Sequence, residues 1–285
     1  MSLLLTIVAT WGIYTLLGIG IVLIYRTSRV LNIAGGELAI FLGYVVAWAV
    51  ADGFPVAAAV PIGLVAAAGL GFAVFWLMLR RIMGQPPHVG LMMTVGIAIL
   101  LNGLIVILFG GGNVTIDAGF SRTMALGGAI LSERDLAAAV GAWVSIAVLA
   151  LVYRVTDLGL QMRAVAEKVM LSAQRGVNIN RVVALSWVLG VIAAALAGTL
   201  HGERAFVAAS AAVIGINALL ACLIGGMDSL RGVVIGGLIV AVSENLTAYY
   251  VDPRYALLTP VGLVLITLVV RPWGLLGTVE EFHRV

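Results

Sequence analysis

Long apolar stretches separated by short polar turns repeat along the chain. A helix that crosses a bilayer needs about 20 consecutive apolar residues. The stretches that approach this length are 3–25, 54–79, 89–109, 136–155, 182–200 and 256–270, and shorter or interrupted ones lie at 30–50, 213–224 and 233–246. We therefore expect an all-α, polytopic membrane protein, a single transmembrane domain over residues 1–285 with about eight to nine transmembrane or re-entrant helices.

Paired glycines interrupt the apolar pattern at two places, each close to a carboxylate. The residues concerned are Asn32, Gly35, Gly36 and Glu37 at the first place and Gly225 and Gly226 at the second. Broken helices at membrane depth occur where the backbone faces protein or a water-lined path. Their free backbone groups and dipole ends can meet a solute without fixed charges. We predict that both breaks line or gate a translocation path.

Ionisable side chains inside apolar stretches are costly unless they face a cavity or a partner. Two roles are open for Glu37: it lines the path, or it caps a helix N-terminus, where the helix dipole favours a carboxylate. We expect Asp228 to be structural, beside Arg231, and Glu244 to lie near the outer membrane interface.

One long segment, residues 157–181, is much more polar than its surroundings. Its apolar residues recur at about helical spacing, which predicts a short amphipathic helix, and Gly176 is placed to end that helix as a C′ glycine. A basic excess between two apolar spans is typical of a cytoplasmic loop. The residues allow two interpretations: a helix that fits a groove of a partner protein, or an ordinary solvated loop.

The basic residues set the expected orientation, because Lys and Arg concentrate in cytoplasmic loops. With the N-terminus outside and the C-terminus inside, the only ones of the 16 basic residues on the outer side are Arg122, Arg134, Arg204 and Arg254. The first span lacks a preceding basic residue and a small-residue cleavage site, so we expect it to be retained. Residues 110–135 then form the outer loop, in which the alternating stretches 114–120 and 121–128 predict a small β-hairpin.

The composition argues against several function classes. At 62% hydrophobic and 10% charged residues, the chain does not have the composition of a soluble domain, and its basic residues form no aromatic-interleaved patch for nucleic acid. The Gly-x-x-x-x-Gly-Lys-Ser/Thr loop that cradles nucleotide phosphates is missing. His88, His201 and His283 are scattered, so no metal site is expected. The single cysteine, Cys222, is expected to be a small buried side chain.

Several motifs follow one another along the chain. They are LNIAGGELAIFLGY at 31–44, RAVAE at 163–167, GVNINRVVAL at 176–185, AAALAG at 193–198, GINAL at 215–219 and LIGGMDSLRG at 223–232. In this order they resemble the LivH-type permease family, which belongs to the ATP-binding-cassette (ABC) importers of branched-chain amino acids and related solutes. Gly35 stands where that family commonly has His.

The resemblance implies a non-catalytic permease subunit in the cytoplasmic (inner) membrane. Its implied partners are a second, LivM-like permease subunit, two ATP-binding subunits, an extracytoplasmic solute-binding protein and membrane lipid. ATP would be bound by the partner subunits, and the chain itself would need no cofactor. The segment 157–181 then resembles the coupling helix that docks into the ATPase, and the residues that match are Arg163, Ala166, Glu167, Gly176 and Asn178.

Three other functions fit a helical membrane protein. An ion-coupled secondary transporter or channel would use Glu37 as its ion site and act without an ATPase. A membrane enzyme would use Glu37 or Glu244 as an acid–base group, although no second catalytic group pairs with either. A structural assembly subunit would tolerate changes at Asn32 and Glu37. Within the permease family, the solute is open among branched-chain amino acids, urea, amides and aromatic acids, as is pairing with an identical or a sister permease.

Overall fold

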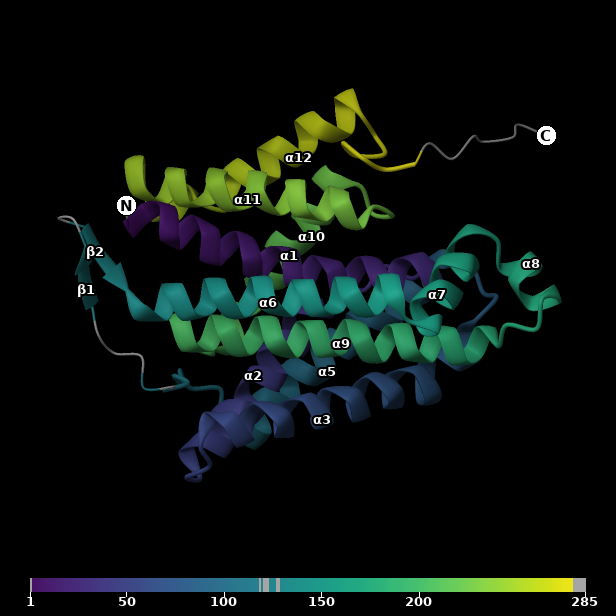
Figure 1. The fold of residues 1–285 in the computed structure, drawn as a ribbon, viewed down its shortest axis with the longest axis horizontal. Coiled ribbons are helices and arrows are strands. Elements are labelled where there is room, and N and C mark those ends of the chain that lie inside the picture. Colours follow the sequence, from purple (N-terminus) through teal and green to yellow (C-terminus); the bar gives the residue numbers. More distant parts are fainter. Residues whose placement is uncertain (1, 118, 120–122, 127–128, 279–285) are drawn as a thin grey trace.

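The computed structural model is a bundle of apolar helices that run roughly side by side (Figure 1). It describes residues 2–117, 119, 123–126 and 129–278. In chain order the elements are α1 (Ser2–Ser28), α2 (Gly35–Ala51), α3 (Val56–Val74), the π-helical η1 (Phe75–Leu79), α4 (Arg80–Ile82), α5 (Pro87–Phe109), β1 (Thr123–Leu126), β2 (Ala129–Ser132), α6 (Glu133–Val155), α7 (Asp157–Glu167), α8 (Val169–Gln174), α9 (Ile179–Arg204), the short 3-10 helix η2 (Ala209–Ala212), α10 (Val213–Gly225), α11 (Leu230–Tyr250), the 3-10 turn η3 (Pro253–Tyr255) and α12 (Leu258–Val270).

The core of the bundle forms around α1 and α9. Helix α1 packs against α6, α9, α10 and α11, whereas α9 packs against α1, α2, α3 and α6. In the apolar part of α1, 89% of the residues are buried inside the protein, compared with 11% in α12. Helix α1 is therefore central, and α12 exposes most of its surface to lipid or to another chain.

Small residues bring α9 close to its neighbours. A Cβ atom at Gly198 would lie only 1.9 Å from the carbonyl oxygen of Ala39 in α2, so the two backbones touch at this point. Ala193, Ala194 and Ala197 of α9 are also buried. Helices in a membrane associate through close packing, because lipid removes the usual hydrophobic driving force, and small residues allow that packing.

The number of helices agrees with the number predicted from the sequence. In the described part of the chain, seven helices are long and apolar enough to cross a membrane, and two apolar helices, Gly35–Ala51 and Val213–Gly225, are shorter. The predicted polytopic, all-α fold with about eight to nine spanning or re-entrant helices is thus confirmed. Helices also end or begin at both Gly-Gly sites: Gly35 and Gly36 are the first residues of α2, and Gly225 ends α10.

The two ends of the bundle carry different elements. The hairpin of β1 and β2 lies at the end where the chain begins, and α7 and α8 lie at the opposite end (Figure 1). The hairpin is antiparallel and pairs Thr123 with Ser132. A hairpin forms in the 110–135 loop, but the predicted strands are wrong: it pairs residues 123–126 with 129–132, whereas Val114, in the predicted first strand, pairs with Val207. Nearer the start of the loop, the Tyr44 hydroxyl donates a 2.7 Å hydrogen bond to the Gly112 carbonyl and ties the loop to α2.

The spans alternate in direction as the predicted topology requires. Arg26 near the end of α1, Arg154 near the end of α6 and Arg231 near the start of α11 line one cavity at the α7 end. At the hairpin end, Arg204 at the end of α9 forms an ion pair with Asp135 near the start of α6. The side of the membrane that each end faces stays a prediction.

The single cysteine lies in the core. The Cys222 side chain, in α10, is 0% exposed, and its thiol donates a 3.5 Å hydrogen bond to the carbonyl oxygen of Gly18 in α1. The prediction of a small buried side chain is confirmed.

Candidate functional site

The polar segment 157–181 forms two helices where the sequence predicted one. Helix α7 ends at Glu167 and α8 begins at Val169, because Lys168 between them adopts an extended conformation with φ −148° and ψ 96°. Gly176 follows the end of α8 with φ +82°, the left-handed conformation of a C′ glycine, as predicted. The Asn178 side chain accepts a 3.1 Å hydrogen bond from the N–H of Arg181 and caps the start of α9.

Helix α7 is fixed to the end of α6. The Arg163 guanidinium donates to the carbonyl oxygens of Tyr153 and Arg154 and lies 5.4 Å from the centre of the Tyr153 ring. Gly159 makes the close approach possible, since a Cβ there would lie 2.0 Å from the Tyr153 carbonyl oxygen. The half-buried Arg163 thus ties α7 to the end of α6, a role that the sequence motif did not reveal.

The two faces of this segment differ. On the inner face, Met162 and Val165 of α7 are buried against Val182 of α9. On the outer face, Glu167 is exposed, and so are the large apolar side chains Leu160, Val169, Met170 and Leu171, with Met170 75% exposed. The segment is therefore anchored to the bundle by its inner face, and its outer face presents an apolar surface beside charged side chains. Ala166 is half-buried between the two.

The first helix break is held by α5. Residues 29–34 between α1 and α2 are not helical. The Thr94 hydroxyl in α5 lies 3.0 Å from the Leu31 carbonyl oxygen and accepts a 3.4 Å hydrogen bond from the Ile33 N–H. Asn32 is only 3% exposed, and its side-chain oxygen makes no hydrogen bond with any residue that the structure describes. Glu37, in the first turn of α2, is half-buried, which is compatible with both roles considered for it.

The starts of α2 and α10 meet at this break. A Cβ atom at Gly36 would lie 2.2 Å from the Ala212 carbonyl oxygen, and one at Gly215 would lie 2.3 Å from the Gly36 nitrogen. Two short helices that enter the bundle from opposite ends thus touch at their N-terminal turns. The sequence singled out Gly36 but gave no sign that Gly215 is its partner.

The second break holds the C-terminal segment. A Cβ at Gly226, which has φ +112°, would lie 2.5 Å from the Gly277 nitrogen. The Leu276 N–H donates a 2.9 Å hydrogen bond to the Gly225 carbonyl, and the Asp228 carboxylate accepts a 3.1 Å hydrogen bond from the Thr278 N–H. Asp228 is therefore structural, as expected, with Thr278 as its partner.

The two breaks lie at different places in the bundle. Gly215 and Gly225 are near opposite ends of α10, so about 15 Å of helix separates them at 1.5 Å per residue. Gly35 and Gly36, with Asn32 just before them in the chain, lie at the start of α10, and Gly225 and Gly226 lie at its end, beside the C-terminal segment.

The sequence analysis missed a polar network at the hairpin end. The Tyr14 hydroxyl donates a 2.6 Å hydrogen bond to Glu244, and the Asn217 amide donates to both of them, at 2.8 Å and 3.1 Å. Arg204 pairs with Asp135 and donates a 2.7 Å hydrogen bond to the Thr10 hydroxyl. Glu244 lies at the hairpin end as expected, but as a bonded, half-buried group.

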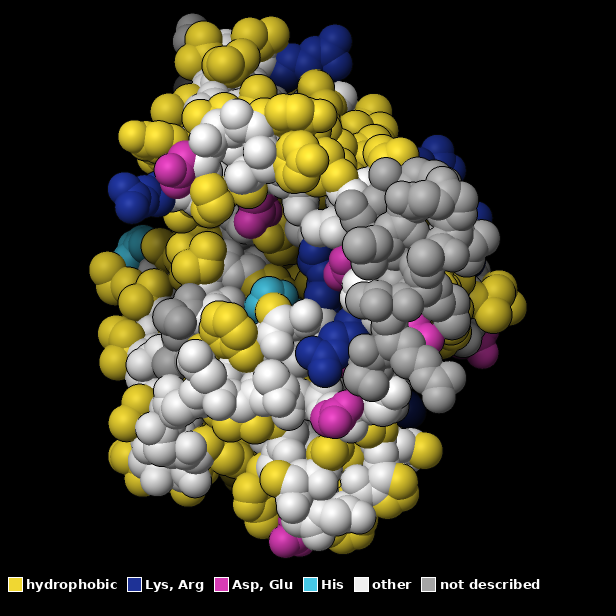
Figure 2. Space-filling view, turned by 90° about the vertical axis from the view of Figure 1, so that its left-hand side faces the viewer, with side chains coloured by type: hydrophobic (Ala, Val, Ile, Leu, Met, Phe, Trp, Pro, Cys, Tyr) yellow, Lys and Arg dark blue, Asp and Glu magenta, His cyan; other side chains and the backbone are white. Residues whose placement is uncertain are grey.

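These polar groups border a hollow in the end of the bundle. A cavity of about 430 Å³ is lined by Tyr14, Asp135, His201, Arg204 and Glu244 among others. Figure 2 shows this end of the molecule, where charged and histidine side chains gather around a hollow between apolar and backbone atoms. The network joins α1, α6, α9, α10 and α11 at this end.

Comparison with known proteins identifies the family. A family model described as "Branched-chain amino acid transport system / permease component" matches residues 3–269. The chain belongs to this permease family. The family resemblance of the sequence motifs is thereby confirmed, and the permease is a multi-pass membrane protein.

Relatives of the permease share almost its whole length. "High-affinity branched-chain amino acid transport system permease protein LivH" of Escherichia coli K12 is 26% identical over 94% of this chain and 92% of its own. "High-affinity branched-chain amino acid transport system permease protein BraD" of Pseudomonas aeruginosa is 25% identical over the same shares. A solved chain of PsaBC from Streptococcus pneumoniae, in complex with Fab, covers 95% of this chain and 93% of its own with a TM-score of 0.51 at 13% identity, a likeness of fold alone.

Proposed function

We propose that this permease is the transmembrane subunit of an ATP-binding-cassette importer that carries branched-chain amino acids or a related small polar solute. Family membership over residues 3–269 supports this function. The observation that carries it is the α7–α8 segment, which is anchored on its inner face and exposes Leu160, Met170 and Leu171 on its outer face. Such a surface suits insertion into a groove of a partner protein.

We infer a set of partners in which this chain is non-catalytic. Two ATP-binding subunits bind and hydrolyse ATP, so the permease itself needs no cofactor. A second, LivM-like permease completes the membrane part, and an extracytoplasmic solute-binding protein delivers the solute. In this assembly the permease lies in the cytoplasmic (inner) membrane. Helices α7 and α8 face the cytoplasm, and the N-terminus lies on the outer side.

We place the translocation path at the first break. Helix N-termini carry a partial positive charge, so the touching starts of α2 and α10 can attract a solute carboxylate without a basic side chain. The buried oxygen of Asn32, which has no hydrogen-bond partner among the described residues, can accept a hydrogen bond from a solute ammonium. The backbone around Gly225 and Gly226, beside the C-terminal segment, is a candidate for gating at the α7 end.

The test is co-purification of the permease with the products of its chromosomal neighbours, followed by ATPase assays with and without loaded solute-binding protein. We expect an ATPase to co-purify and to be stimulated by the loaded binding protein. The double variant Glu167→Ala/Gly176→Leu should lose the stimulation of the ATPase by loaded binding protein. Glu167→Ala removes an exposed charge, and Gly176→Leu strains a left-handed backbone position.

A matched pair of variants locates the contact. Met170→Glu on α8 should reduce ATPase co-purification, whereas Tyr250→Glu should not, since Tyr250 is similarly exposed, at 73% against 75%, but ends α11 at the hairpin end. Solute transport by the purified permease alone, driven by an ion gradient, would refute the proposal and make Glu37 the residue of interest.

A further inference from the structure

A basic cavity lies at the α7 end of the bundle. It has a volume of about 470 Å³ and is bordered by α1, α6, α7 and α11 and by the turn before α11. Four arginines, Arg26, Arg154, Arg163 and Arg231, and one carboxylate, Asp228, line it. The cavity therefore has a formal excess of three positive charges.

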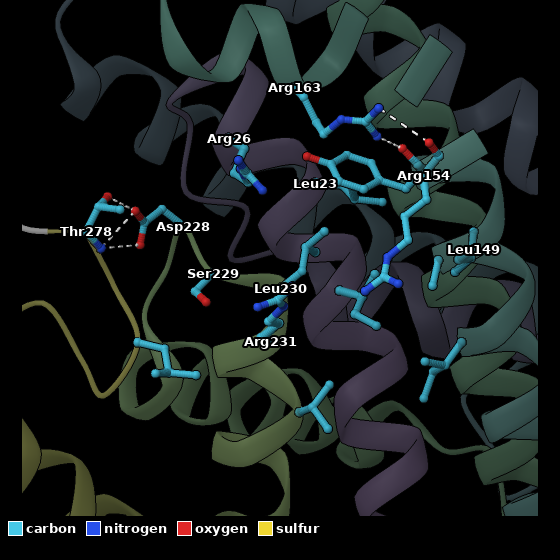
Figure 3. A pocket seen from close by; sticks show the side chains of 16 residues that line it. Leu23, Arg26, Leu149, Arg154, Arg163, Asp228, Ser229, Leu230, Arg231 and Thr278 are labelled. Atoms are coloured by element: carbon cyan, nitrogen blue, oxygen red, sulfur yellow. Dashed lines mark hydrogen bonds between the residues drawn. The ribbon is translucent and has the colours of Figure 1, made fainter. Parts of the chain in front are cut away.

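None of the four arginines of this cavity forms an ion pair with a described residue. Among the described residues, the guanidinium groups of Arg154 and Arg231 also make no hydrogen bond. The Asp228 carboxylate is bonded to Thr278. Figure 3 shows Arg154 and Arg231 extending toward the same space from α6 and α11, while Asp228 is turned away to Thr278. The positive charge of these side chains is thus available to bind an anion from outside the chain.

Further polar groups of the cavity suit a phosphate. Ser229 accepts a 3.0 Å hydrogen bond from the Gly232 N–H and caps α11, a helix of 21 residues whose N-terminus borders the cavity. The Tyr153 ring lies 5.9 Å from the Arg26 guanidinium, and its hydroxyl has no hydrogen-bond partner within the described residues.

The rest of the cavity wall is apolar and continues into the lipid-facing surface. Ile19, Leu23, Leu149 and Val234 line it beside the arginines. The helices on its two sides are poorly buried, with 22% of the apolar part of α6 and 33% of that of α11 inside the protein. An occupant therefore needs an anionic head and long apolar chains.

We propose that this cavity binds the headgroup of one anionic phospholipid, with its phosphate between Arg154 and Arg231 and its acyl chains along α1, α6 and α11. Basic pockets between membrane helices bind such headgroups. Because Arg163 belongs to α7, the lipid links the membrane part of the bundle to the proposed coupling segment. The inference concerns lipid binding and does not depend on the solute or on ATP.

The experiment measures lipid retained by the full-length permease in native mass spectrometry after exchange into phosphatidylglycerol or phosphatidylcholine. We expect one phosphatidylglycerol to be retained about thirtyfold more than phosphatidylcholine, since Arg154 and Arg231 each contribute about 1 kcal/mol near an anionic lipid. Arg154→Gln/Arg231→Gln should remove that preference. The control is Arg80→Gln/Arg81→Gln, which removes the same charge from exposed residues that do not line the cavity.

Several outcomes would overturn the site. Equal retention of phosphatidylglycerol by wild type and Arg154→Gln/Arg231→Gln would exclude the cavity as the lipid site. An equal loss of the preference in the Arg80→Gln/Arg81→Gln control would indicate that lipid binds to a diffuse basic surface. Displacement of the lipid by millimolar inorganic phosphate would indicate a free-anion site.

Discussion

At the scale of single residues, two contacts far apart in the sequence define the first helix break. Gly36 touches Gly215, and Thr94 bonds the backbone at Leu31 and Ile33. The paired glycines gave a reason to examine Gly36. Gly215 stood out only as part of the family motif at 215–219 and Thr94 did not stand out, because glycine is common in membrane helices and a threonine there usually bonds its own helix.

Adjacent glycines at this break should respond differently to the same substitution. Gly36→Ala places a Cβ 2.2 Å from a carbonyl oxygen, whereas Gly35→Ala places one 3.5 Å from the nearest side-chain atom. We expect Gly36→Ala to cost about 1–3 kcal/mol and to lower the thermal midpoint by at least about 2 °C. Size-exclusion profiles after heating measure this. Equal midpoints for both variants would contradict the contact between α2 and α10.

The Thr94 hydroxyl gives a second residue-scale prediction. Thr94→Val keeps the shape but leaves the Ile33 N–H without its bond, at a cost of about 0.5–1.5 kcal/mol for the loss of a part-buried hydrogen bond. Thr267→Val is the control, because the one partner of the Thr267 hydroxyl among the described residues is the Leu263 carbonyl of its own helix, at 2.8 Å. The same heating assay should give a lower midpoint for the Thr94 variant alone.

At the scale of elements, hydropathy predicted the spans well and the polar segment only in part. The predicted stretch 89–109 corresponds to Pro87–Phe109, and 136–155 to Glu133–Val155, because lipid forces the backbone of an apolar stretch into helical hydrogen bonds. Outside the apolar spans, packing against the rest of the protein determines where a helix begins and ends. The interruption at Lys168 and the bonds of Arg163 to the end of α6 depend on contacts that periodicity does not contain.

The position of α7 should depend on Gly159. Gly159→Ala requires α7 to move from the Tyr153 carbonyl, while Gly69→Ala in α3 meets nothing within 4 Å. We expect trypsin to cut after Lys168 and Arg175 about five times faster in the Gly159 variant, since about 1 kcal/mol of local destabilisation changes an open population by that factor. Unchanged cleavage rates would show that α7 tolerates the extra atom.

At the scale of the whole molecule, the two ends of the bundle differ in charge. The α7 end has a basic cavity, and the hairpin end has paired acidic and basic side chains such as Asp135 and Arg204. These clusters give the relative directions of the spans that carry them, α1, α6, α9 and α11. The orientation in the membrane still depends on the positive-inside rule.

Fusions to alkaline phosphatase, which is active only outside the cytoplasm, test that orientation. A fusion after Gly112, in the loop at the hairpin end, should be active, and a fusion after Gln174, at the end of α8, should be inactive. The reverse pattern would place α7 and α8 outside the cell and would remove the proposed contact with an ATPase.

The buried Cys222 can report the unfolding of the permease through the reaction of its thiol. It is the single cysteine of the chain and is fully inaccessible in the folded protein, so a maleimide dye that fluoresces on reaction with thiols should stay dark until the contact between α10 and α1 opens. A single sharp rise on heating is expected for cooperative loss of the core. Labelling at room temperature in folded protein would contradict the burial of α10 against α1.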